Sequence, residues 1–149
     1  MITFDANVHF YALDWSDPAK QVAADRVLRE AEAAKSGFVL LQALGEFAFA
    51  SVRKGLFARD EAASLVMGWS SLFPVAAPHP SSLAAAIDWW VAERFSYWDA
   101  LLLATAADAG ATAIASEDLQ DGAVVAGVEI INPFAPGARQ RLALHGLAP

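Results

Sequence analysis

The sequence predicts a single α/β domain in which a parallel sheet is covered by helices on both faces. Short and almost wholly apolar runs, typical of strands buried on both faces, alternate along the chain with longer segments of helical periodicity. The connections between them are short, and no repeat or linker divides the 149 residues. One domain is therefore expected.

The chain opens with the apolar run 2–4, which we expect to be a central strand of this sheet. Residues 7–13 follow as a short helix or turn. Asp17 and Pro18 form a favourable helix start, because Asp is a good N-cap residue and Pro is tolerated at the first helical position. This helix ends before the run 38–41, which predicts a second parallel strand.

The middle of the chain predicts two further helices, over 42–54 and 59–71. The run 72–75 is expected to be an edge strand, because Pro74 has no N–H to donate to a neighbouring strand. The remaining predicted elements are a helix from Ser81 or Ser82 to Arg94, a helix over 97–109, a strand over 112–115 and a strand over 128–131. The folded domain is expected to span 1–135, and 136–149 to form a short, basic, loosely ordered tail.

Composition excludes several classes of protein. The chain has no cysteine, so a disulfide framework, a thiolate metal site and a cysteine nucleophile are impossible. The apolar run 100–107 is too short to cross a membrane, and no basic region precedes the apolar N-terminus as in a secretory signal. A cytoplasmic protein is expected. With 56% hydrophobic residues, some apolar surface is expected to be covered by a partner.

The net charge of −7 predicts a surface that repels nucleic acid. Bound cations can invert the charge of an acidic centre, so an enzyme that acts on nucleic acid is still allowed. Asp5 is the first candidate for such a centre, because it follows the first strand and ligands of open α/β sheets bind at the carboxyl ends of the strands.

Three later acids could reach the same edge. Glu46 is the only charged residue in 38–52, so it lies either on an exposed helix face or in a cleft. Asp99 begins an apolar helix, where pairing with Ser96 as a cap and a functional role are equally supported. Asp118 lies in the acidic segment 116–122, which could be an ordinary turn or a source of oxygen ligands.

Four carboxylates cannot share one cleft without neutralisation. One or two Mg²⁺ or Mn²⁺ ions would offset their repulsion, polarise a phosphodiester and lower the pKa of a bound water. Convergence of the four acids therefore predicts metal-dependent phosphodiester chemistry.

The motifs FDAN at 4–7, QALGEF at 42–47, YWDALLLATA at 97–106 and SEDLQDG at 116–122 resemble a PIN domain, and more narrowly the VapC-type toxins of bacterial toxin–antitoxin pairs. The resemblance spans nearly the whole chain. It implies a three-layer fold with a parallel five-stranded sheet of order 3-2-1-4-5. It also implies a Mg²⁺- or Mn²⁺-dependent endoribonuclease that leaves a 5′-phosphate and a 3′-hydroxyl on RNA.

The resemblance also assigns residues and partners. It places the acidic catalytic and metal-binding positions at Asp5, Glu46, Asp99 and Asp118. It places auxiliary positions at Asn7, which orients the first acid, and at Ser116 and Asp121. The partners it implies are an RNA substrate, a second copy of the chain in a homodimer, and a cognate antitoxin whose segment lies near the acidic cleft.

Other functions are weighed against this one. A haloacid-dehalogenase-like phosphatase needs Asp-x-Asp, but position 7 is Asn, and a receiver-like domain needs a late lysine, whereas none follows Lys54. A catalytically inactive PIN-like module that binds a protein partner remains the alternative. The isolated histidines are expected on the surface or in loops, and they are His9, His79 and His145.

Overall fold

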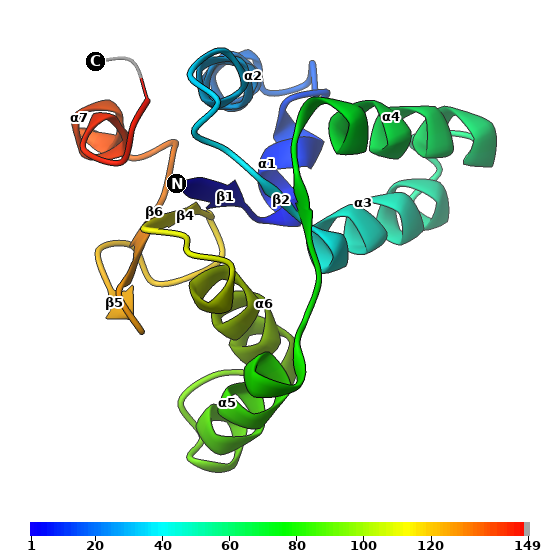
Figure 1. Ribbon diagram of the computed structural model, residues 1–149. Helices are drawn as coiled ribbons and strands as arrows, with labels where there is room; N and C mark the ends of the chain where they lie inside the picture. The colour runs from blue at the N-terminus through cyan, green and yellow to red at the C-terminus, as the bar shows by residue number, and fades with distance from the viewer. Residues whose placement is uncertain (148–149) are drawn as a thin grey trace.

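The computed structural model describes residues 1–147, and 148–149, the end of the predicted tail, lie outside this part of the chain. Seven helices and six short strands occur in the described residues, so the predicted mixed α/β domain with a mostly parallel sheet is confirmed (Figure 1). The strands are β1 (Ile2–Phe4), β2 (Val39–Leu40), β3 (Val75–Ala76), β4 (Ala113–Ala115), β5 (Val124–Val125) and β6 (Val128–Ile131). The helices are α1 (Ala6–Tyr11), α2 (Pro18–Ala33), α3 (Leu41–Arg53), α4 (Arg59–Leu72), α5 (Pro80–Val91), α6 (Tyr97–Asp108) and α7 (Ala138–Ala143).

The predicted five-stranded sheet of order 3-2-1-4-5 is wrong in strand count and order. The main sheet has four strands in the order β1-β4-β6-β5, and β2 and β3 form a separate parallel pair. Between β1 and β2 lies an isolated parallel bridge from Ile2 to Gly37. Beside this bridge, the hydroxyl of Thr3 donates to the carbonyl of Phe38 at 3.0 Å. A side-chain hydrogen bond thus adds to the contact between the two segments.

The strand β5 is absent from the sequence prediction. It pairs with β6 in an antiparallel hairpin whose two loop residues, Ala126 and Gly127, both have positive φ. Loops of this length favour such a backbone, but the sequence signal for it is Asn-Gly or Asp-Gly. Because Ala126 does not carry that signal, the hairpin was not expected.

Helix starts are predicted well where a side-chain cap decides them. Asp17 caps α2 and Ser96 caps α6, each by accepting a hydrogen bond from a backbone N–H of the first turn. The expected start of α5 at Ser81 or Ser82 is wrong, since His79 is the cap and Pro80 the first helical residue. The predicted strand 72–75 is also displaced, because α4 continues to Leu72 and β3 begins at Val75.

Two apolar cores lie on opposite faces of the main sheet. Alternate side chains of β4 show this, because Ala113 and Ala115 pack with α2 and α7, whereas Ile114 packs with α6. His9 lies fully buried beside Trp69, so the expectation of a surface histidine at this position is wrong. In residues 1–147 no helix is long and apolar enough to cross a membrane.

The segment expected to be a loosely ordered tail contains α7. Ala138 and Leu142 of this helix, together with Leu147, are buried in the core that also holds α2. Arg141 fixes the helix to the sheet by bonding Glu129 of β6. The apolar residues of this segment explain the docking.

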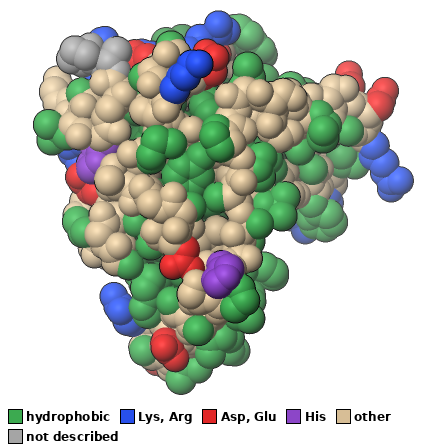
Figure 2. Space-filling model, in the orientation of Figure 1, with side chains coloured by type: hydrophobic (Ala, Val, Ile, Leu, Met, Phe, Trp, Pro, Cys, Tyr) green, Lys and Arg blue, Asp and Glu red, His purple; other side chains and the backbone are tan. Residues whose placement is uncertain are grey.

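Apolar side chains also remain on the surface, where they form much of the face seen in Figure 2. They include Phe49, Leu56, Met67 and Leu72 around α3 and α4, and Leu83, Trp90, Val91 and Trp98 around α5 and α6. Such exposure agrees with the high hydrophobic content of the sequence.

Candidate active site

Asp5 is held at the junction of β1 and α1. Its Oδ1 accepts a hydrogen bond from the backbone N–H of Ala6 at 2.6 Å, which makes it the N-cap of α1. Its Oδ2 accepts from Ser116 Oγ at 2.7 Å and from Asn7 Nδ2 at 3.1 Å. Only 8% of Asp5 is exposed, so its carboxylate is both buried and fixed in orientation.

The sheet brings the acidic segment 116–122 to Asp5. Strands β1 and β4 are parallel neighbours, so their carboxyl ends share one edge, and the N–H of Asp5 donates to the carbonyl of Ala115 at 3.0 Å. Ser116, fully buried, is the next residue, and its hydroxyl also accepts from the N–H of Leu119 at 3.3 Å. This turn carries Asp118 round to the same edge.

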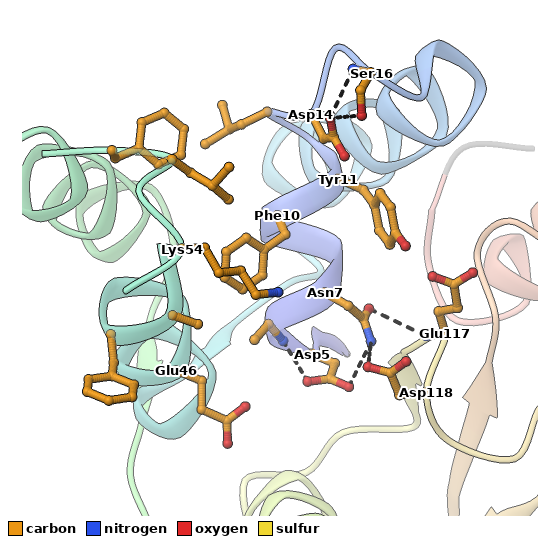
Figure 3. A pocket seen from close by; sticks show the side chains of 16 residues that line it. Asp5, Asn7, Phe10, Tyr11, Asp14, Ser16, Glu46, Lys54, Glu117 and Asp118 are labelled. Atoms are coloured by element: carbon orange, nitrogen blue, oxygen red, sulfur yellow. Dashed lines mark hydrogen bonds between the residues drawn. The ribbon is translucent and has the colours of Figure 1, made fainter. Parts of the chain in front are cut away.

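Asn7 links the two carboxylates, as Figure 3 shows. Its Nδ2 donates to Asp5 Oδ2 at 3.1 Å and to Asp118 Oδ2 at 3.2 Å, and its Oδ1 accepts from the N–H of Glu117 at 3.4 Å. The two carboxylate oxygens therefore lie within hydrogen-bond distance of one nitrogen. The predicted positions Asp5, Asn7, Ser116 and Asp118 are brought together.

The electrostatics of this group disfavour a charged Asp5. Burial raises the pKa of Asp5 from 3.8 to about 6, against the lowering effect of the hydrogen bonds from Ser116 and Ala6. The charges of Glu46 and Asp118 raise this pKa further. Within residues 1–147 no Lys, Arg or His forms an ion pair with any of these three acids. A bound cation would supply the missing positive charge.

Glu46 approaches from α3, on the side of Asp5 opposite to Asp118 (Figure 3). It is exposed, as one of the two sequence interpretations required, yet it lines the same pocket as Asp5. Its Oε1 accepts from Gln42 Nε2 at 3.0 Å. Gln42 Nε2 also lies 3.0 Å from the carbonyl of Trp98, which places the first turn of α6 beside Glu46.

Asp99 is not brought into contact with Asp5 or Asp118. Its Oδ2 accepts from Ser96 Oγ at 2.7 Å, and its N–H donates to the same hydroxyl at 3.2 Å. This reciprocal pair is the capping interpretation offered by the sequence. Asp99 also does not line the pocket that contains the other three acids.

Asp121 lies in a different cluster. Its Oδ1 accepts from Arg141 Nη1 at 2.8 Å and from the N–H of Asn132 at 2.8 Å. These contacts connect the turn after β4 to α7 and to the end of β6. The structure therefore supports a stabilising role for Asp121 and does not place it in the pocket.

The pocket has a volume of about 730 Å³. Five acids line it, which are Asp5, Asp14, Glu46, Glu117 and Asp118, and aromatic and aliphatic side chains form most of the rest. The apolar side chains are Phe10, Tyr11, Leu13, Phe49, Leu56 and Phe57. Lys54 is the basic residue of the lining, and sequence reasoning missed it because its place depends on how α3 ends.

The donors suit a hard divalent cation. No group of three or more His, Cys, Asp or Glu residues that could hold a metal occurs in the described part of the chain. Mg²⁺, however, is commonly held by one or two carboxylates while keeping several waters. The neighbouring oxygens of Asp5 and Asp118, which have no cationic partner among residues 1–147, meet that requirement.

No protein-family model matches the chain, and a comparison with curated proteins finds no match.

Proposed function

We propose that this protein is a metal-dependent endoribonuclease and acts as the toxin of a toxin–antitoxin pair. The observation that carries the proposal is the pair Asp5 and Asp118, whose oxygens share the amide of Asn7 at the carboxyl edge of a parallel sheet. The raised pKa of Asp5 gives this pair a reason to bind a cation. The motifs that resemble VapC-type toxins supply the substrate class.

In this proposal each residue of the pocket has a separate role. Asp5 and Asp118 hold Mg²⁺ or Mn²⁺, while Ser116 and Asn7 keep the carboxylate of Asp5 in one orientation. Such an ion, when bound, would polarise the phosphodiester and lower the pKa of a bound water. Glu46, whose Oε1 accepts a hydrogen bond from Gln42, would hold a water or a second ion. Asp99 remains a predicted ligand on the motif alone.

The proposal includes two protein partners. Exposed apolar residues around α3 and α4 offer a surface for a second copy of the chain and for an amphipathic segment of the antitoxin. A basic side chain from that segment would replace the metal charge beside Asp5. Affinity for the antitoxin should therefore weaken as the Mn²⁺ concentration rises at constant ionic strength. An affinity that does not change with the Mn²⁺ concentration would exclude charge replacement.

The second candidate is a catalytically inactive PIN-like module that binds a protein. It is favoured by the hydrogen bonds of Asn7, which already engage one oxygen of each carboxylate, and by Asp99, whose carboxylate accepts from Ser96. Such a module should cut no RNA and should not be stabilised by Mn²⁺.

The deciding experiment is cleavage of total RNA by the purified protein, followed by sequencing of the new ends. We expect 5′-phosphate and 3′-hydroxyl ends with Mg²⁺ or Mn²⁺ and none in excess chelator. Asp25→Asn, the same chemical change on a partly exposed carboxylate of α2 that pairs with Arg29, serves as the control for loss of a carboxylate outside the pocket. Cleavage that continues undiminished in chelator would exclude the metal mechanism.

A further inference from the structure

Lys54 is a cation in a pocket whose other charged lining residues are all acids. It lines the pocket together with Asp5, Glu46 and Asp118, and it forms no ion pair within the described chain. An unpaired ammonium in the lining of this pocket is available to a ligand of opposite charge. The acids alone would repel such a ligand.

The backbone fixes where Lys54 emerges. Lys54 is the C-cap of α3, and Gly55 follows with φ of 70°, a conformation that costs glycine little. The N–H of Gly55 donates to the carbonyl of Val52 at 3.0 Å, and the N–H of Leu56 donates to that of Ser51 at 2.9 Å. These two bonds form a Schellman motif, which sets the direction of the chain at this position.

The side chain of Lys54 extends across Phe10 towards Asn7 (Figure 3). Its Nζ lies 5.4 Å from the centroid of the Phe10 ring, and Phe10 packs against Phe47 with ring centroids 4.9 Å apart. An aromatic ring attracts a cation without neutralising it as a carboxylate would. Phe10 therefore supports the ammonium inside the pocket.

A charge at a helix C-terminus has an ordinary explanation, because it interacts favourably with the helix dipole. Arg53, in the last turn of α3, already occupies that place, and its guanidinium lies over Phe49 at 5.5 Å. Arg53 lines a neighbouring pocket with Arg59, and not the acidic one. Figure 2 shows basic side chains at the end where α3 and α4 join. Of the basic residues, Lys54 lines the acidic pocket.

We propose that Lys54 binds a backbone phosphate of the RNA strand that lies in the pocket, next to the phosphate that is cut. This inference rests on the proposed nuclease function. Glu46, Ala50 and Lys54 follow one another at intervals of four along one side of α3 and all line the pocket. At 1.5 Å per residue, Glu46 and Lys54 are separated by about 12 Å along the helix axis. Lys54 thus positions the strand and leaves the chemistry to the acidic end.

The first test measures binding of a single-stranded RNA to variants in an Asp5→Asn background, which prevents cleavage. Lys54→Gln should weaken binding roughly tenfold, as expected for loss of a charged contact. It should also reduce the slope of log affinity against log salt by about 0.7, the value for one phosphate contact to a single strand. Lys54→Arg should retain most of the affinity.

Lys35→Gln is the matched control. It makes the same chemical change at an exposed lysine that lines none of the described pockets. Equal salt slopes for Lys54→Gln, Lys35→Gln and the parent would overturn the inference, provided that thermal unfolding shows all three to be folded.

The second test separates this inference from the proposed function. In the otherwise unchanged enzyme, Lys54→Gln should raise KM about tenfold and leave kcat within about twofold. If Lys54→Gln has an unchanged KM and Asp5→Asn is inactive, the role of Lys54 is refuted and the proposed function stands. An active Asp5→Asn would instead refute the proposed function.

Discussion

Two groups of acids lie along the same sheet and differ in what neutralises them. In the first, Asp5 and Asp118 are bridged by the neutral amide of Asn7. In the second, Arg141 bonds Asp121 at 2.8 Å and Glu129 at 2.8 Å. His145 Nε2 also lies 2.8 Å from Glu129, and its hydrogen bond, followed by that of Arg141, lowers the pKa of Glu129.

The difference separates a structural group from a candidate binding site. The second group carries its own cations and ties α7 to β6, so it has no need of an external ion. Asp5 is buried without such a cation, and its pKa is raised to about 6. A carboxylate pair that lacks a protein cation is the one expected to take up a metal.

The largest expected effect comes from Asp5→Asn. The substitution keeps the shape of the side chain and removes the charge that binds the cation. RNA cleavage should fall roughly 1,000-fold, since metal-ion catalysis supplies several kcal/mol. Initial rates with Mg²⁺ would measure the loss, and a variant as active as the parent would remove Asp5 from the metal site.

The pH dependence of stability sharpens the comparison. The folded protein holds the Asp5 proton more tightly than the unfolded chain, because its pKa is about 6 instead of 3.8. The stabilisation from this proton is complete below about pH 4 and is lost as the pH rises through about 6. Without metal, Asp5→Asn should therefore gain stability over the parent as the pH rises, by up to about 3 kcal/mol at pH 7.

Urea unfolding of both proteins between pH 4 and pH 7 would measure this difference. Burial lowers the pKa of His9 to about 3, so His9 makes both proteins less stable as the pH falls. Because both proteins contain His9, its effect cancels in the difference. A difference independent of pH would show that Asp5 titrates normally.

Arg141→Gln tests the second group. It leaves the carboxylates of Asp121 and Glu129 without their guanidinium partner. The free energy of unfolding should fall by about 1–3 kcal/mol. Cleavage at a temperature well below unfolding should stay unchanged, and a large loss of kcat there would mean that this group also serves the reaction.

The smallest expected effect is that of Asp99→Asn. Asparagine keeps an oxygen that can accept from Ser96, so the start of α6 should be retained. We expect cleavage to fall by about tenfold, which corresponds to 1.36 kcal/mol, because Asp99 lies outside the pocket lining. Loss equal to that of Asp5→Asn would show that Asp99 enters the site when RNA and metal bind.

Much of the site follows from simple rules of chain topology. An acid directly after a buried strand lies at the carboxyl edge of the sheet, which predicted Asp5. Asp118 lies at the same edge because it follows β4, which is the parallel neighbour of β1. Asp99 and Asp121 lie outside this group, because Ser96, three residues earlier, and Arg141, 20 residues later, bind their carboxylates elsewhere.

Other features depended on contacts between distant residues. The pairing of Asp121 with Arg141, 20 positions later, could not be read before the docking of α7 was known. The contact between β1 and the start of β2 includes the hydrogen bond from the hydroxyl of Thr3 to Phe38, across 35 residues. Lys54 enters the pocket because Gly55 reverses the chain after α3, and the sequence alone does not show which pocket lies beyond that turn.

The most direct test of the central claim is thermal unfolding during a Mn²⁺ titration at pH 7, with ionic strength constant. The parent and the control Asp25→Asn should be stabilised, by about 2.7 kcal/mol at 100 times the dissociation constant. Asp5→Asn and Asp118→Asn should show little or no stabilisation. The same stabilisation in all four proteins, or none in the parent, would contradict a metal site between Asp5 and Asp118.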